Sequence, residues 1–164
     1  RSNAKPNENI YVSGLIGEAS KGLKSFTDKL EVTEQQIQSY LRPKARIDLG
    51  LRLKGVASSA IDISDGLLQD LKHICVASGV GAQIELSDIP TSFNVDPSIS
   101  EINSGDDYEI CFTSNSENEA IVKGISEELG IKISLIGKTN DSKAIRVLDK
   151  EGNDVPVGSG YSHF

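Results

Sequence analysis

The hydrophobic period of the chain changes at Gly66, and this change limits the folds that the sequence can adopt. Residues 59–63 form a short apolar run typical of a buried strand, whereas the apolar residues after Gly66 recur at helical spacing as far as Ser78. Other strand-like and helix-like segments follow, but the two kinds do not alternate strictly. We therefore expect an α/β (α+β) fold, in which helices cover a mixed β-sheet.

Capping and turn-forming residues separate the expected elements. Thr33 suits the N-cap of a helix, and Pro43 lies just beyond the end of that helix. Residues 87–104 contain Pro and Ser and are expected to form a loop. The expected strands are 10–13, 59–63, 83–86, 108–113, 131–136 and 144–148, and the expected helices are 17–26, 34–41, 47–53, 67–78 and 117–129.

Composition excludes several classes of protein. The 164 residues carry a net charge of -7, which argues against a generic nucleic-acid binder. No apolar run approaches the roughly 18 residues that suggest a membrane span, so we expect no membrane partner. Cys75 and Cys111 are too few for a disulfide framework; we expect buried reduced thiols and a cytoplasmic location. The absence of methionine predicts that the chain is part of a longer protein, whose remainder precedes Arg1.

A first group of carboxylates lies where a buried strand passes into a helix. Asp62 and Asp65 flank Ser64 at this junction. On one interpretation, Ser64 or Asp65 simply caps the helix, where the helix dipole favours a carboxylate. Capping does not account for Asp62, and ligands gather at strand ends in α/β sheets. A structural role and a metal or phosphate site therefore both stay open.

A second acidic cluster, formed by Asp106, Asp107 and Glu109, adjoins another expected strand. Three carboxylates this close repel one another unless they are solvated or bridged by cations. The cluster alone is typical of a solvated turn, but two such clusters in one domain favour divalent metals and a phosphorylated ligand. The sequence contains no P-loop, dinucleotide-binding, zinc-protease or nucleophile-elbow motif. Neither His73 nor His163 has an evident acidic or nucleophilic partner.

Five segments of the chain have a recognisable pattern: AIDISDGLLQDLKHI, SGDDYEICFT, the final GYSHF, RSNAKPNENIYVSG and LRPKARIDLGLRL. AIDISDGL and the GY-x-HF pattern of the final segment are specific in combination. In these segments the chain resembles the thiamine-monophosphate kinase family, within the superfamily of aminoimidazole-ribonucleotide synthetase and selenophosphate synthetase. The resemblance implies that the γ-phosphate of ATP is transferred to thiamine monophosphate, giving thiamine diphosphate, with Mg²⁺. Alternatives are a related enzyme acting on another phosphorylated substrate, or a non-catalytic binding or assembly domain.

The resemblance also implies a domain organisation and a set of site residues. Residues 1–14 would be the link and the last strand of a missing N-terminal ATP-binding domain, and residues 15–164 the C-terminal α/β domain. The resemblance also implies a homodimer built on the N-terminal domain. Without that domain we expect this fragment to be inactive. The implied site residues are Asp62 and Asp65 for metal, Arg1 and Ser64 for ATP, and Asp106 and Tyr161 for thiamine monophosphate.

Overall fold

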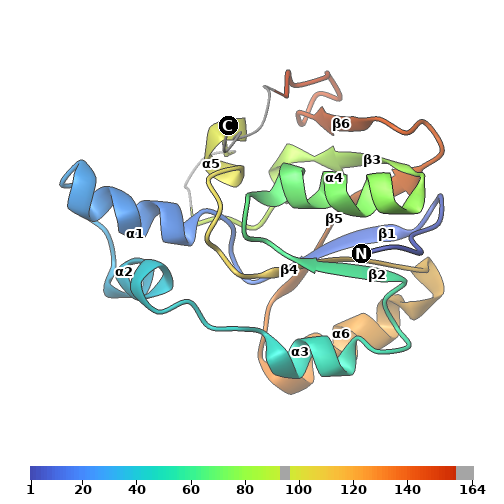
Figure 1. Cartoon of the computed structure of the whole chain (residues 1–164), viewed down its shortest axis with the longest axis horizontal. Coiled ribbons are helices and arrows are strands. Elements are labelled where there is room, and N and C mark those ends of the chain that lie inside the picture. Colours follow the sequence, from blue (N-terminus) through green and yellow to red (C-terminus); the bar gives the residue numbers. More distant parts are fainter. Residues whose placement is uncertain (93–96, 158–164) are drawn as a thin grey trace.

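Six strands form one mixed sheet in the computed structural model, which describes residues 1–92 and 97–157. The strand order is β2-β4-β1-β5-β3-β6, and all neighbours are antiparallel except the parallel pair β3 and β6. The expectation of a mixed sheet covered by helices is confirmed (Figure 1). The strands are β1 (Asn9–Ser13), β2 (Ser59–Asp62), β3 (Gly81–Glu85), β4 (Ile110–Ser114), β5 (Ile133–Asn140) and β6 (Ile145–Leu148).

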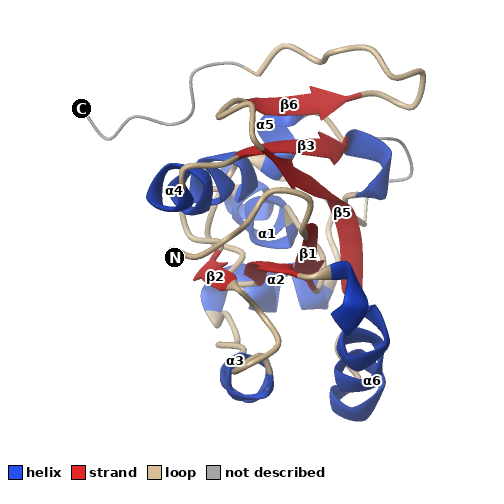
Figure 2. Cartoon of the chain, turned by 90° about the vertical axis from the view of Figure 1, so that its right-hand side faces the viewer, coloured by secondary structure: helices blue, strands red, loops and turns tan. Residues whose placement is uncertain are grey.

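Helices lie on both faces of the sheet (Figure 2). Helix α4 packs on one face and α3 and α6 on the other, while α1 and α2 form a hairpin beyond the end of the sheet (Figure 1). The helices are α1 (Glu18–Thr27), α2 (Glu34–Leu41), α3 (Ile47–Arg52), α4 (Leu67–Ser78), α5 (Ile99–Ile102) and α6 (Glu119–Leu129), with short 3₁₀ turns η1 (Leu86–Asp88) and η2 (Ser116–Asn118).

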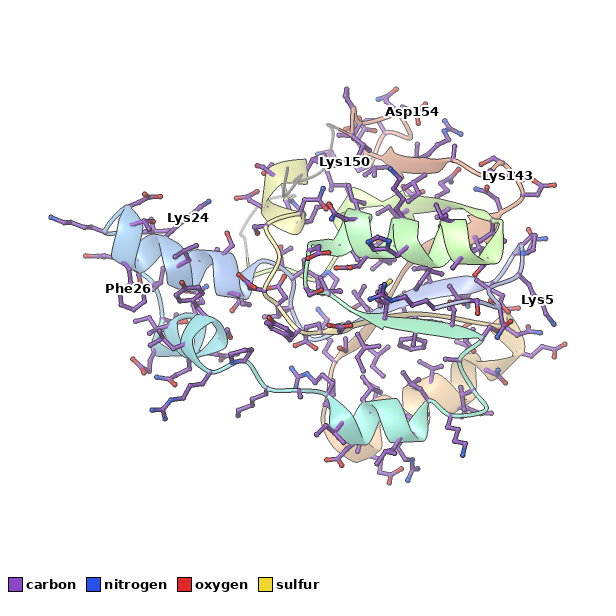
Figure 3. All side chains as sticks on the ribbon, in the orientation of Figure 1. Lys5, Lys24, Phe26, Lys143, Lys150 and Asp154 are labelled. Carbon is purple, nitrogen blue, oxygen red and sulfur yellow. The ribbon has the colours of Figure 1, made fainter. Side chains whose placement is uncertain are left out.

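Two hydrophobic cores stabilise this arrangement, one on each face of the sheet. Val12 belongs to the core under α4, whereas its neighbour Tyr11 belongs to the core under α3 and α6. This alternation follows from the two-residue period of a strand. Tyr11 stacks on Phe112 with ring centroids 5.1 Å apart. In the α1–α2 hairpin, Phe26 lies near Tyr40 with centroids 6.2 Å apart (Figure 3).

Strand β1 lies at the centre of the sheet, between β4 and β5. Asn9 pairs with Ser114 on one side and with Lys138 on the other. We expected residues 1–14 to be a link and the last strand of a preceding domain, but β1 forms part of the sheet of this domain. A domain boundary after residue 14 would therefore separate β1 from the other five strands of its own sheet. A short apolar strand carries no local signal for the sheet that it joins, which is why its sequence did not reveal this position.

Other expected boundaries agree with the structure to within a few residues, with two differences. Residues 87–104, expected as a loop, include α5, which begins with a capping box between Ser98 and Glu101. Strand β5 continues to Asn140, beyond its expected end. The N-cap expected at Thr33 is confirmed, because its hydroxyl accepts a hydrogen bond from the backbone N–H of Gln36.

Two bulk expectations can be compared with the described residues. Cys75 and Cys111 are both free and buried, as expected. Within residues 1–92 and 97–157, no helix combines the length and apolar character that a membrane crossing requires.

Candidate functional site

The structure brings the two acidic segments of the sequence, residues 62–66 and 103–109, together at one end of the sheet. We call these two segments the joined loops. Three backbone hydrogen bonds join them. The N–H groups of Asp106 and Tyr108 donate to the carbonyls of Ser64 and Ile63, at 3.0 and 2.8 Å, and the N–H of Ile63 donates to the carbonyl of Glu109 at 2.7 Å. Two segments more than forty residues apart in sequence thus lie side by side.

Glycines permit this close approach. A Cβ atom on Gly105 would lie 2.7 Å from the carbonyl oxygen of Ser64, and one on Gly66 would lie 2.6 Å from that of Asn103. Both glycines also have positive φ angles, which side chains disfavour. Each loop therefore depends on a glycine at its contact with the other.

Helix α4 begins without a cap from its own sequence. Its N-cap is Gly66, which has no side chain to accept a hydrogen bond. The Oδ1 atom of Asn103 accepts from the N–H of Leu68 at 2.9 Å instead, so the cap comes from the second acidic segment. The interpretation that Ser64 or Asp65 caps this helix is therefore wrong, because the chain turns sharply at Gly66 before the helix starts.

Asp70 fixes the loop that carries Ser64 and Asp65. Its Oδ2 atom accepts hydrogen bonds from the N–H groups of both residues, each at 3.0 Å. Burial raises the pKa of Asp70, while these two hydrogen bonds act to lower it. The sequence analysis missed this residue. The available signal was its position between Leu67 and Ile74, as an acid within the apolar stripe of a helix.

Asp65, Asp70 and His73 form a group of candidate metal ligands. One ligand atom from each lies within 4.8 Å of the others. Oxygen donors of this kind are those that Mg²⁺ prefers, so the carboxylates fit a divalent cation. Asp62 is outside this three-residue group. It is exposed at the end of β2, where alternation directs it away from the α4 core that contains Ile61.

The three carboxylates of the second segment have different surroundings. Asp106 is exposed and has a φ angle of 62°. Asp107 caps α1 by accepting from the N–H of Gly17 at 2.8 Å and from that of Ala19 at 3.3 Å. Burial raises the pKa of Asp107 to about 6, against the opposing effect of these hydrogen bonds.

Glu109 is buried and paired with a distant arginine. Nε and Nη2 of Arg46 donate to its two oxygens at 2.8 and 2.5 Å, and the Ser13 hydroxyl donates to it at 2.5 Å. The cluster is therefore more than a solvated turn, since Asp107 and Glu109 each hold another element of the fold. Asp106 is the member that stays directed to solvent.

Residues 5–150 match the family described as AIR synthase related protein, C-terminal domain. The chain belongs to this family. The superfamily resemblance in the sequence motifs is thereby confirmed.

Relatives of this AIR synthase related domain are thiamine-monophosphate kinases. The chain is 36% identical to that of Buchnera aphidicola subsp. Schizaphis graminum over 177 residues and to that of Escherichia coli K12 over 178 residues. All of this chain is covered, but only 55% and 54% of those proteins. The chain thus spans about half the length of the curated relatives that it matches.

Solved structures give the same result. The thiamine-monophosphate kinase of Stenotrophomonas maltophilia K279a matches with a TM-score of 0.83 and 30% identity, over 94% of this chain and 53% of that one. A structure of AaThiL complexed with AMPPCP and TMP matches with a TM-score of 0.77 and 27% identity, over 99% of this chain and 53% of that one.

Of the two remaining predicted site residues, Arg1 does not belong to the joined loops. Arg1 is exposed, and the nearby N–H of Ala4 donates to the hydroxyl of Ser78 at the C-terminal end of α4. Asp65 precedes the other end of that helix, so this contact does not bring Arg1 to Ser64. Tyr161 lies outside the described residues.

Proposed function

We propose that the protein containing this chain transfers the γ-phosphate of ATP to thiamine monophosphate, forming thiamine diphosphate. The observation that carries the proposal is the junction of the two acidic loops at one end of the sheet. The similarity to thiamine-monophosphate kinases along the whole chain supports it. Our proposal also includes a preceding ATP-binding domain, a homodimer formed through that domain and a cytoplasmic location.

The proposed reaction needs few catalytic side chains. The nucleophile is a phosphate oxygen that is already anionic at neutral pH, so no general base is required. The main obstacle is the repulsion between two polyanions, which positioning and charge neutralisation reduce. Bound Mg²⁺ would supply that neutralisation. Asp62 and Asp65 would hold it, and both can reach solvent, since Asp62 is exposed and Asp65 half-buried.

The other site residues have binding roles in this proposal. Ser64 lies between the two aspartates and would contact ATP, as would Arg1. The exposed Asp106 would attract the cationic thiazolium of thiamine monophosphate. Tyr161 would contribute an aromatic face, an interaction worth about 0.5–2 kcal/mol.

The decisive experiment compares Asp62→Asn with the wild type in the full-length protein. Conversion of thiamine monophosphate to the diphosphate is followed by chromatography at saturating Mg²⁺-ATP. We expect turnover to fall at least about 100-fold, the scale on which loss of one charge-stabilising group acts. Asp141→Asn, at an exposed position in the turn between β5 and β6, makes the same charge change and should keep normal turnover.

Two results would contradict the proposal. One is a wild-type rate in Asp62→Asn with cooperative unfolding retained. The other is a clear preference for a different phosphate acceptor in a panel that includes aminoimidazole ribonucleotide precursors, which would favour another enzyme of the superfamily.

A further inference from the structure

A polar cleft of about 540 Å³ lies beside the joined loops. It is lined by residues of α2, by the segment 42–46 that connects α2 to α3, and by the segment just before β4. Asp107 and Glu109 line the cleft together with Arg42, Lys44 and Arg46. In an acidic chain with a net charge of -7, this is a local concentration of basic side chains.

The two carboxylates that line the cleft are already occupied. Glu109 accepts both hydrogen bonds of the Arg46 fork, so this pair is neutral as a unit. Asp107 directs its oxygens to the N–H groups at the start of α1. The arginine and the start of α1 thus offset part of the negative charge of the lining.

The cations, in contrast, keep unused donors. Arg42 and Lys44 are exposed, and neither side chain forms an ion pair or hydrogen bond within residues 1–92 and 97–157. The Nη1 group of Arg46 likewise has no hydrogen-bond partner in that part of the chain. Pro43 restricts the backbone between the first two cations, which limits the geometries that they can adopt.

The remaining lining residues of the cleft are Pro43 and three neutral polar residues of α2. Gln35, Gln38 and Ser39 line it from α2. A ligand suited to this lining carries negative charge and several hydrogen-bond acceptors. Arginine is the side chain best matched to phosphate, because its planar fork can bind two oxygens at once.

The segment that carries Arg46 leads into α3, the helix that covers the face of the sheet to which Asp62 points. Asp62 pairs with Ile110, and Ile110 packs against the core under α3. Arg46 is the N-cap residue of α3.

We propose that this cleft is a phosphate-binding subsite, in which Arg42, Lys44 and the free edge of Arg46 receive one phosphate group. The ligand class is a phosphate monoester or the terminal phosphate of a nucleotide. Assignment of that phosphate to a substrate rests on the proposed function, whereas the binding of inorganic phosphate does not.

The test is a titration of the ¹⁵N-labelled chain with inorganic phosphate, followed by NMR. Saturable shifts are expected in residues 35–46 and 106–109. The double variant Arg42→Gln/Lys44→Gln should bind at least ten times more weakly. Lys54→Gln/Lys123→Gln makes the same charge change at exposed positions outside the cleft and should bind as the wild type does. Equal weakening in the two double variants, or shifts confined to other residues, would overturn the proposal.

Two further titrations identify the source of the phosphate. If the cleft receives the acceptor, Arg42→Gln/Lys44→Gln should lose affinity for thiamine monophosphate but not for ATP. Loss of affinity for ATP but not for thiamine monophosphate assigns the cleft to the nucleotide. Loss of neither affinity refutes a substrate role. Arg42→Gln alone provides a milder variant whose fold is checked by the dispersion of the same spectra.

The two proposals can fail separately. Normal turnover in Asp62→Asn, together with phosphate bound in the cleft, contradicts the proposed function and leaves the subsite. Lost turnover in Asp62→Asn, together with unchanged phosphate affinity in Arg42→Gln/Lys44→Gln, contradicts the subsite and leaves the proposed function.

Discussion

The carboxylate of Asp70 accepts a hydrogen bond of 3.0 Å from the backbone N–H of Asp65. A residue that is only 1% exposed thereby fixes the loop that carries a candidate metal ligand. The same oxygen accepts from Ser64, so one side chain determines the course of the backbone between β2 and α4.

Asp70→Ala should lower the free energy of unfolding by about 2–3 kcal/mol, because two backbone donors lose their acceptor in a poorly hydrated place. Asp70→Asn should cost less than half as much, since an amide oxygen can still accept and burial of a neutral group is cheaper. Urea denaturation of both variants measures the difference. Equal losses would show that the two N–H groups do not depend on this acceptor.

The pH dependence of stability should contain a contribution from Asp107. Its pKa is raised from 3.8 to about 6 by burial, so the folded state keeps a proton that the unfolded chain releases. The stability that this group contributes is complete below pH 3.8 and is lost as the pH rises through about 6. The free energy of unfolding, relative to Asp107→Asn, should fall by at most about 3 kcal/mol over this range. Urea denaturation of both proteins between pH 4 and pH 7 tests this, and a constant difference contradicts it.

Two Arg–Glu pairs should differ strongly in their contribution to stability. Arg46→Ala leaves Glu109 buried without its cation and should cost about 3 kcal/mol. Arg52→Ala breaks a pair with Glu128 in which both side chains are about half exposed, and it should cost less than about 1 kcal/mol. Chemical denaturation of the two variants is the comparison, and similar losses would show that burial does not govern the effect.

Two glycine substitutions should change the free energy of unfolding in opposite directions. Gly66→Ala would place a Cβ 2.6 Å from a backbone oxygen at a φ of 109°, and a loss of about 2 kcal/mol or more is expected. Gly124→Ala lies in α6 with nothing within 4 Å of the new Cβ and should gain about 0.5–1 kcal/mol. Thermal unfolding followed by circular dichroism gives both shifts. A tolerated Gly66→Ala would mean that the contact with Asn103 can relax.

Local sequence patterns were sufficient to predict most elements of the fold. The change of period at Gly66 predicted the passage from β2 to α4, and Thr33 predicted the start of α2. The α5 turn was missed because four helical residues do not establish a period. The position of β1 was missed because pairing with β4 and β5 is a long-range property.

The candidate site was only partly predictable for the same reason. The two acidic segments could be recognised, but not that they are hydrogen-bonded to each other or that Asn103 caps α4. The separate partners of Asp107 and Glu109 depend on where α1 and Arg46 lie in space. A pattern of carboxylates in the sequence predicts where a site lies, whereas the role of each carboxylate follows from its tertiary contacts.

The central place of β1 also affects how a growing chain can reach this structure. Strand β1 leaves the ribosome before the other strands of this sheet, yet its two neighbours, β4 and β5, are synthesised much later. Until then its apolar residues lack the partners that bury them, and such exposed strands favour aggregation and recruit chaperones. Because distant pairings of this kind slow folding, we expect the hydrogen bonds between β1 and β5 to form only after Lys138 has been translated.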